Sequence, residues 1–173
     1  FLRVHDKYPN DVGVLAALLL NYVQMRPGEA LYLAAGQLHA YLAGLGVEIM
    51  ANSDNVLRGG LTSKHVDVPE LVKVLDFSSL DDPFAATSEQ GNVVSFHLPV
   101  QDFIMSAHRV DAEHPMHVDT DGPAIILCTE GQVCAGDFVL TPGQAAWIPA
   151  SDPAVTFDVA EGSTTAQCFY ARV

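Results

Sequence analysis

Short runs of alternating apolar and polar residues, separated by turn residues, fill the second half of the chain. They recur at even spacing, over residues 93–100, 103–107, 124–129, 138–141, 145–148, 154–158 and 166–171. Turn-forming pairs such as Glu130-Gly131 and Pro142-Gly143 stand between them. Many short strands joined by tight turns are typical of a small antiparallel barrel or sandwich. The pattern predicts a β domain over residues 93–173.

The N-terminal region has helical rather than alternating spacing. Asp11 can cap a helix whose apolar side carries Val14, Leu15, Leu18, Leu19 and Tyr22. Asp67, followed by Pro69 and Glu70, predicts the start of a second, short helix. Residues 80–92 are small and acidic and include proline and glycine, which predicts a linker and a division near residue 80.

Residues 26–67 lie between these regions and mix both kinds of signal. Alternation over 37–42 sends His39 and Tyr41 to one face of a predicted strand and apolar side chains to the other. A second alternating run over 47–51 can pair with it as a hairpin, which would bring Glu48 beside His39 or Tyr41. A turn cluster over 52–55 then leads into a loop that carries Arg58.

The charge balance narrows the classes of partner. The 173 residues carry a net charge of −13 with only eight Lys plus Arg, which disfavours nucleic acid or an anionic membrane as a partner. Two of those eight cations, Arg58 and Lys64, fall close together, as a phosphorylated ligand would require. The sequence leaves open the alternative that they pair with Asp54 or Asp67.

Three cysteines, Cys128, Cys134 and Cys168, show no C-x-x-C spacing and predict reduced thiols in the core of a cytoplasmic protein. No apolar run approaches the roughly 20 residues that a membrane-spanning helix needs. The chain begins at Phe1 within a helical pattern, so we interpret it as a fragment of a longer protein.

A second group of histidines lies in the predicted β domain. His108, His114 and His117 are followed by Asp119 and Asp121, and imidazole with carboxylate suits a divalent metal. The sequence H-P-M-H falls in a predicted loop where proline breaks regular spacing, which favours no designed metal site there. His97 alternates with apolar residues and is expected to be a hydrogen-bonded strand residue.

The two phrases PGEALYLAAGQLHAYLAG and VEIMANSDNVLRGGLTSKHVDVPEL carry a family resemblance. They resemble the signature region of the type I phosphomannose isomerases, zinc enzymes that interconvert mannose 6-phosphate and fructose 6-phosphate. The match is strong over residues 27–77 and loose elsewhere. It implies a mainly β, cupin-like (jelly-roll) fold with short helices at the N-terminal end.

The resemblance also implies how the chain is divided. Residues 1–25 would end a helical insert, and residues 26–79 would be the returning strands of the catalytic cupin domain. After the linker over 80–92, residues 93–173 would form a C-terminal cupin-like domain without metal. In that domain TPGQAAWIPASDPAV repeats the first phrase in outline, with Pro153 and Ala154 where His39 would fall. The family's other zinc ligands lie in an N-terminal region that this chain lacks.

By the resemblance, His39 is a zinc ligand, Arg58 is catalytic, and the residues lining the sugar-phosphate pocket are Tyr41, Glu48 and Lys64. Glu48 and a zinc-bound water are both candidates for proton transfer. The implied function is an aldose–ketose isomerase of mannose and GDP-mannose metabolism. Two positions depart from the family pattern, with Gly59 in place of alanine and Ser63 in place of proline. Two alternatives stay open: a non-catalytic cupin module that binds sugars or another protein, and a cupin metal enzyme with different chemistry.

Overall fold

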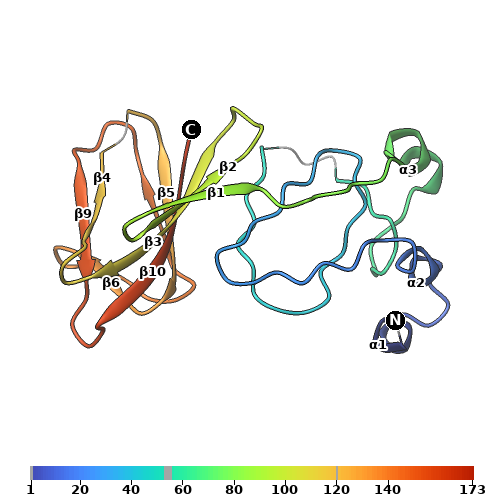
Figure 1. The fold of residues 1–173 in the computed structure, drawn as a ribbon, viewed down its shortest axis with the longest axis horizontal. Helices are drawn as coiled ribbons and strands as arrows, with labels where there is room; N and C mark the ends of the chain where they lie inside the picture. The colour runs from blue at the N-terminus through green and yellow to red at the C-terminus, as the bar shows by residue number, and fades with distance from the viewer. Residues whose placement is uncertain (1, 53–55, 120) are drawn as a thin grey trace. The chain divides into compact units, whose positions relative to one another are not determined.

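A computed structural model describes residues 2–52, 56–119 and 121–173, which form two compact units (Figure 1). Unit 1 comprises the chain up to Met25 together with Tyr32–Pro83. Unit 2 comprises Arg26–Leu31 and Phe84–Val173. All strands of the described chain belong to unit 2, whereas unit 1 holds three short helices joined by irregular segments.

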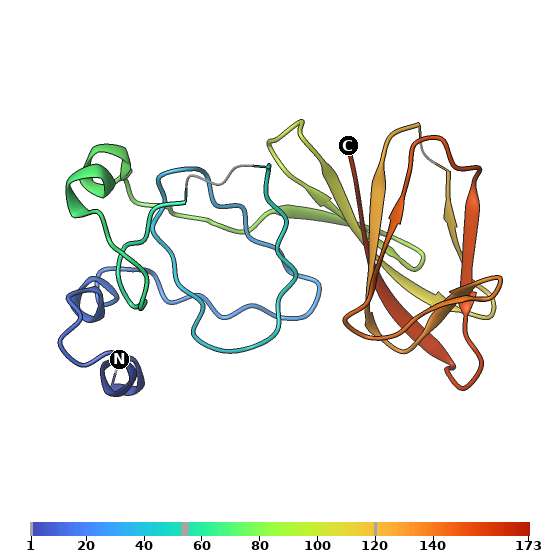
Figure 2. The same ribbon diagram turned by 180° about the vertical axis from the view of Figure 1, so that it is seen from behind.

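Unit 2 is built from two antiparallel sheets that face each other (Figures 1 and 2). One sheet has six strands in the order β1-β2-β3-β10-β5-β8, and the other has four in the order β4-β9-β6-β7. The prediction of a mainly antiparallel β fold is confirmed. The strands are β1 (Ala86–Gln90), β2 (Val93–His97), β3 (Ile104–Asp111), β4 (Met116–Val118), β5 (Ala124–Glu130), β6 (Val133–Ala135), β7 (Phe138–Leu140), β8 (Ala145–Ile148), β9 (Val155–Val159) and β10 (Thr165–Arg172).

The core of unit 2 lies between the two sheets. Its fully buried side chains of largest volume are Ile126, Leu140, Val110, Val133, Cys128 and Cys168. Cys128 and Cys168 face each other across β5 and β10, and all three cysteines are free. Burial raises the pKa of the Cys168 thiol to about 12. The two buried cysteines therefore act as small, protonated core residues, as the sequence predicted.

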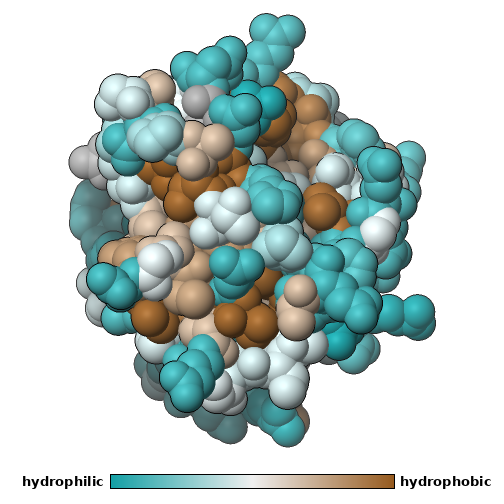
Figure 3. All heavy atoms as spheres, turned by 90° about the vertical axis from the view of Figure 1, so that its left-hand side faces the viewer, coloured by the Kyte–Doolittle hydropathy of each residue, from teal (hydrophilic) through white to brown (hydrophobic). Residues whose placement is uncertain are grey.

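One end of unit 2 exposes both polar and hydrophobic side chains. Figure 3 views one end of this unit, where hydrophobic side chains appear as separate patches between polar ones. Scattered exposure of this kind is ordinary for a folded domain, since polar atoms cannot cover the whole surface.

Three strands, β1, β4 and β6, lie outside the ranges predicted as strands. β1 falls inside the range predicted as a linker, and all five of its residues are exposed, so no apolar alternation marks it. It is an edge strand, held by pairing with β2 alone. β4 falls in the predicted H-P-M-H loop, where Met116 and Val118 are buried against the core. β6 lies between two predicted strands, over 124–129 and 138–141, where no strand was predicted.

Unit 1 carries α1 (Leu2–Lys7), α2 (Gly13–Ala16) and α3 (Val68–Val74). The second predicted helix is confirmed as α3, because the Asp67 carboxylate accepts a 3.0 Å hydrogen bond from the Glu70 backbone N–H. The first is wrong in length, since α2 ends after four residues and Leu19 beyond it is 88% exposed. Helices this short depend on packing, and that apolar side stays largely uncovered. No helix in the described ranges is long and apolar enough to cross a membrane.

The strands predicted over 30–33, 37–42 and 47–51 do not form ladders. In the described part of these segments the backbone is irregular apart from one bridge between Leu31 and Phe84. A strand requires a hydrogen-bonded neighbour, and an isolated hairpin is marginal in water. The predicted turn cluster of 52–55 lies largely outside the described residues, which omit 53–55.

Adjacent isoleucines on β5 test the position of the core. Ile126 is fully buried, whereas Ile125 is 42% exposed on the opposite face. We expect Ile126→Ala to lower the free energy of unfolding by about 2–5 kcal/mol, through lost burial and a cavity. The matched Ile125→Ala should lower it by less than about 1 kcal/mol. Urea denaturation measures both, and equal losses would contradict this placement of the core.

Candidate active site

The segment that carries His39 begins at a turn anchored to the C-terminal side of α3. The Gln37 side-chain oxygen accepts a 3.0 Å hydrogen bond from the Ala34 N–H and so closes the turn. The Asp76 N–H, just after α3, donates a 3.0 Å hydrogen bond to the Gly36 carbonyl. These contacts fix where the chain leaves the turn, two residues before His39.

One ring nitrogen of the His39 imidazole has a partner among the described residues. Its Nδ1 lies 3.0 Å from the Gln37 carbonyl oxygen. A carbonyl only accepts, so Nδ1 carries a proton, and in the neutral form of the ring Nε2 keeps its lone pair. The side chain is exposed. A ring held through Nδ1 by a backbone carbonyl, with Nε2 available, is the arrangement found in histidines that bind zinc.

Tyr41 lies next to His39 and interacts with Glu48. The His39 and Tyr41 rings are 6.0 Å apart between centroids and stand edge to face at 67°. Partial burial raises the pKa of Tyr41, and the negative charge and hydrogen bond of Glu48 raise it further. The predicted proximity of Glu48 to Tyr41 is therefore confirmed, although no strand ladder aligns the two segments.

The loop with Arg58 packs against the His39 segment. The contact joins Gly59, next to Arg58, and Leu38, next to His39. A Cβ added at Gly59 would overlap the tip of the Leu38 side chain, so backbone and leucine are in close contact. Alanine, usual at this position in the resembling family, would require Leu38 to turn aside. The contact places the Arg58 loop beside the segment that bears His39.

Arg58 and Lys64 are both exposed. Within the described ranges neither side chain forms an ion pair with a carboxylate. Asp67, one of the two alternative partners, is engaged in capping α3, and the other, Asp54, lies outside the described residues. The two cations are thus available to an anionic ligand.

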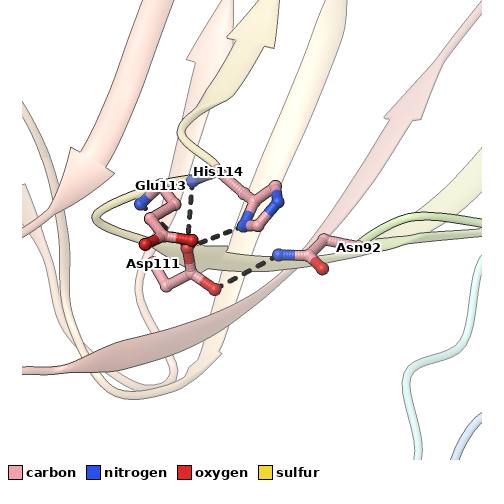
Figure 4. A network of polar contacts seen from close by, with 4 residues as sticks. All are labelled: Asn92, Asp111, Glu113 and His114. Atoms are coloured by element: carbon pink, nitrogen blue, oxygen red, sulfur yellow. Dashed lines mark hydrogen bonds and ion pairs between the residues drawn. The ribbon is translucent and has the colours of Figure 1, made fainter.

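The second histidine group has a different arrangement, and Figure 4 shows its member His114 with Asp111, Glu113 and Asn92. The Asp111 carboxylate holds His114 Nδ1 at 2.9 Å and accepts a 3.3 Å hydrogen bond from the Asn92 amide. His117 Nδ1 lies 2.9 Å from the Thr156 hydroxyl, and His108 Nε2 lies 2.8 Å from that of Ser106. His97 has a similar partner, the Ser88 hydroxyl, at 2.8 Å, as predicted.

A cavity of about 350 Å³ at the β3–β4 turn is lined in part by His108, His114 and His117. Burial lowers the pKa of His108, which favours the neutral form of this imidazole. Nowhere in the described part of the chain do three His, Cys, Asp or Glu side chains converge to hold a metal. Each imidazole of this group instead has its own protein partner.

Comparison with known proteins supplies the wider context. No family model matches the chain. The chain is 40% identical over 159 residues to mannose-6-phosphate isomerase of Escherichia coli, covering 88% of this chain and 40% of that protein. The rat enzyme of the same name is 37% identical over 163 residues, covering 90% and 38%. The chain thus spans about two fifths of the length of these relatives.

Solved structures agree with these relatives. Salmonella typhimurium mannose 6-phosphate isomerase, bound to fructose 6-phosphate and zinc, aligns with a TM-score of 0.79 at 36% identity. The alignment covers 98% of this chain and 44% of that one. The apo form of the same protein gives a TM-score of 0.80.

The fold therefore belongs to the cupin class, as predicted. Within that class, the chain is homologous to the C-terminal portion of the phosphomannose isomerases. The resemblance inferred from the signature phrases is confirmed over most of the chain.

The pairing of Tyr41 with Glu48 can be tested by titration. Glu48→Gln removes the negative charge that disfavours the phenolate, so the pKa of Tyr41 should fall toward its ordinary value. NMR of ¹³Cζ-labelled tyrosine measures it, with Tyr41→Phe to assign the signal. Glu29→Gln, whose carboxylate bonds the Arg26 N–H in unit 2, is the control and should leave it unchanged. An unchanged pKa in Glu48→Gln would contradict the contact.

Proposed function

We propose that this chain supplies part of the active site of a zinc-dependent aldose–ketose isomerase that interconverts mannose 6-phosphate and fructose 6-phosphate. The observation that carries the proposal is the His39 ring, held through Nδ1 by the Gln37 carbonyl, so that Nε2 keeps its lone pair in the neutral form. That ring lies in a segment beside the Arg58 loop, through the Leu38 contact with Gly59. The names of the homologous proteins support the same reaction.

The donor set of this chain fits zinc in part. His39 would provide one nitrogen ligand, and a tetrahedral zinc site needs further protein ligands. The resemblance assigns these to the N-terminal portion of the family. When bound, zinc would act as a Lewis acid on the oxygens at the reacting carbons of the sugar.

Arg58 and Lys64 would act on the charged groups of the substrate. The Arg58 guanidinium stays protonated at any relevant pH, so it would stabilise the negative charge that develops on an enediol-like intermediate. Lys64 would contact the phosphate as a point charge. Their lack of carboxylate partners among the described residues supports this division of roles.

Proton transfer between the two reacting carbons would fall to Glu48. Its interaction with Tyr41 supports this role, because the Glu48 charge and hydrogen bond help to raise the pKa of Tyr41. The raised pKa of Tyr41 keeps the phenol protonated, so that it can donate to Glu48 or to a sugar hydroxyl. Tyr41 thus lines the substrate side of the same group of residues.

Unit 1 also exposes an apolar surface that further polypeptide would cover. Large hydrophobic side chains exposed there include Leu15, Leu18, Leu19, Tyr22, Leu42, Leu45, Met50 and Val56. Exposure of many large hydrophobic side chains is a feature of surfaces that bind further polypeptide. We assign its cover to the N-terminal portion found in the relatives, which also carries the remaining ligands. Free thiols fit a cytoplasmic place in mannose and GDP-mannose metabolism.

An isomerase assay on two preparations tests the proposal. The first is this chain alone, and the second is this chain combined with the N-terminal portion of the Salmonella typhimurium relative. We expect zinc and mannose 6-phosphate isomerisation in the combined preparation. A combined preparation that folds but neither retains zinc nor isomerises the sugar would contradict the proposal, and sugar binding without turnover would favour the non-catalytic module.

Two substitutions in the combined preparation separate the roles of His39 and Arg58. His39→Ala should lower zinc content, measured by elemental analysis, because it removes a ligand. Arg58→Ala should leave zinc content unchanged and lower kcat by about 100-fold or more, because it removes charge stabilisation from the transition state.

Exposed residues of the same type on α1 provide the matched controls. His5→Ala and Arg3→Ala should change neither zinc content nor turnover. Full zinc in His39→Ala would remove that residue from the ligand set. Unchanged turnover in Arg58→Ala would remove Arg58 from the mechanism.

A further inference from the structure

Asp11 uses its two carboxylate oxygens on two distant parts of unit 1. Oδ1 accepts a 2.7 Å hydrogen bond from the Gly13 N–H, at the start of α2. Oδ2 accepts a 2.8 Å hydrogen bond from the Leu61 N–H, 50 residues further along the chain. The first bond lies beside the start of α2 but is not the predicted cap, because the N-cap residue of α2 is Val12, which makes no side-chain cap hydrogen bond. The second bond ties the start of α2 to the loop that carries Arg58.

The backbone at this point is shaped to receive the carboxylate. Gly60 has φ +128, and a Cβ there would stand 3.0 Å from both Asp11 Oδ1 and the Gly13 Cα. Leu61 adopts a left-handed conformation, with φ +54. Such a conformation is costly for a branched residue and persists where surrounding contacts determine it. The Asp11 bond to the Leu61 N–H is such a contact.

The position of Leu61 gives the bond its importance. It lies three residues after Arg58 and three before Lys64. The same loop meets Leu38 at Gly59. Leu38 and Asp11 thus hold the loop at Gly59 and at Leu61. Both points lie between the two cations in the sequence. Because both cations project from this short span, the two contacts limit where they can reach.

We propose that Asp11 is a positioning residue that holds the 58–64 loop so that Arg58 and Lys64 face the sugar phosphate. This inference rests on the proposed function for its catalytic consequence. Asp67 shows what a local role looks like, because among the described residues its carboxylate accepts from the Glu70 N–H within its own helix. Asp11 instead bonds the Leu61 N–H, in a loop 50 residues away.

Kinetics of the combined preparation test the positioning role. Asp11→Ala should lower kcat by about 10- to 100-fold, since small displacements of a catalytic group cost this much. The kcat of Asp11→Asn should lie between those of Asp11→Ala and the unchanged protein, because one amide oxygen replaces two carboxylate oxygens as acceptor. The control Asp67→Ala removes a carboxylate acceptor of the same chemistry and should lower the melting temperature without lowering kcat. Equal kcat in Asp11→Ala and Asp67→Ala would overturn the proposal.

Amide hydrogen exchange provides a readout that does not depend on activity. In Asp11→Ala the Leu61 N–H should exchange at least about tenfold faster, since its acceptor is lost. In Asp67→Ala it should not change. If the unchanged protein shows no isomerase activity, the proposed function fails, and exchange at Leu61 then decides whether Asp11 holds the loop. An unchanged exchange rate of the Leu61 N–H in Asp11→Ala would overturn the role of Asp11 in holding the loop.

Discussion

The candidate site depends on the close approach of Gly59 to Leu38. This contact joins the loop that carries Arg58 to the segment that carries His39. Each catalytic candidate is one residue away from it, so the contact sets the separation of an imidazole and a guanidinium without a strand ladder. Asp11 provides the second point of attachment of the loop, through Leu61. The chemistry proposed for the site thus depends on a few contacts in a unit with little regular structure.

The two units show how strongly a strand depends on its neighbour. The phrase around Trp147 forms β8, because β5 pairs with it from Ala124 to Leu127. The similar phrase around Tyr32 makes a single bridge, at Leu31. Comparable alternation therefore yields a strand in one place and an irregular segment in the other. The difference lies in whether another strand offers its N–H and C=O groups.

Sequence reasoning succeeded where the signal was local and failed where it depended on distant partners. The bounds of β8 and the Asp67 cap of α3 follow from adjacent residues, and both were predicted. β1 was missed because its exposed residues carry no alternation. The signature phrases identified the family, and they predict His39 and Arg58 as site residues. They could not reveal the Asp11 bond to Leu61, since 50 residues separate the two.

The proposed site requires that the His39 and Arg58 segments lie side by side. One NMR measurement tests this proximity. With selectively labelled leucine methyl groups, we predict a strong nuclear Overhauser effect between the Leu38 methyls and the Gly59 α-protons, because the two groups are in van der Waals contact. Its absence in the folded protein, with both signals assigned, would contradict the account.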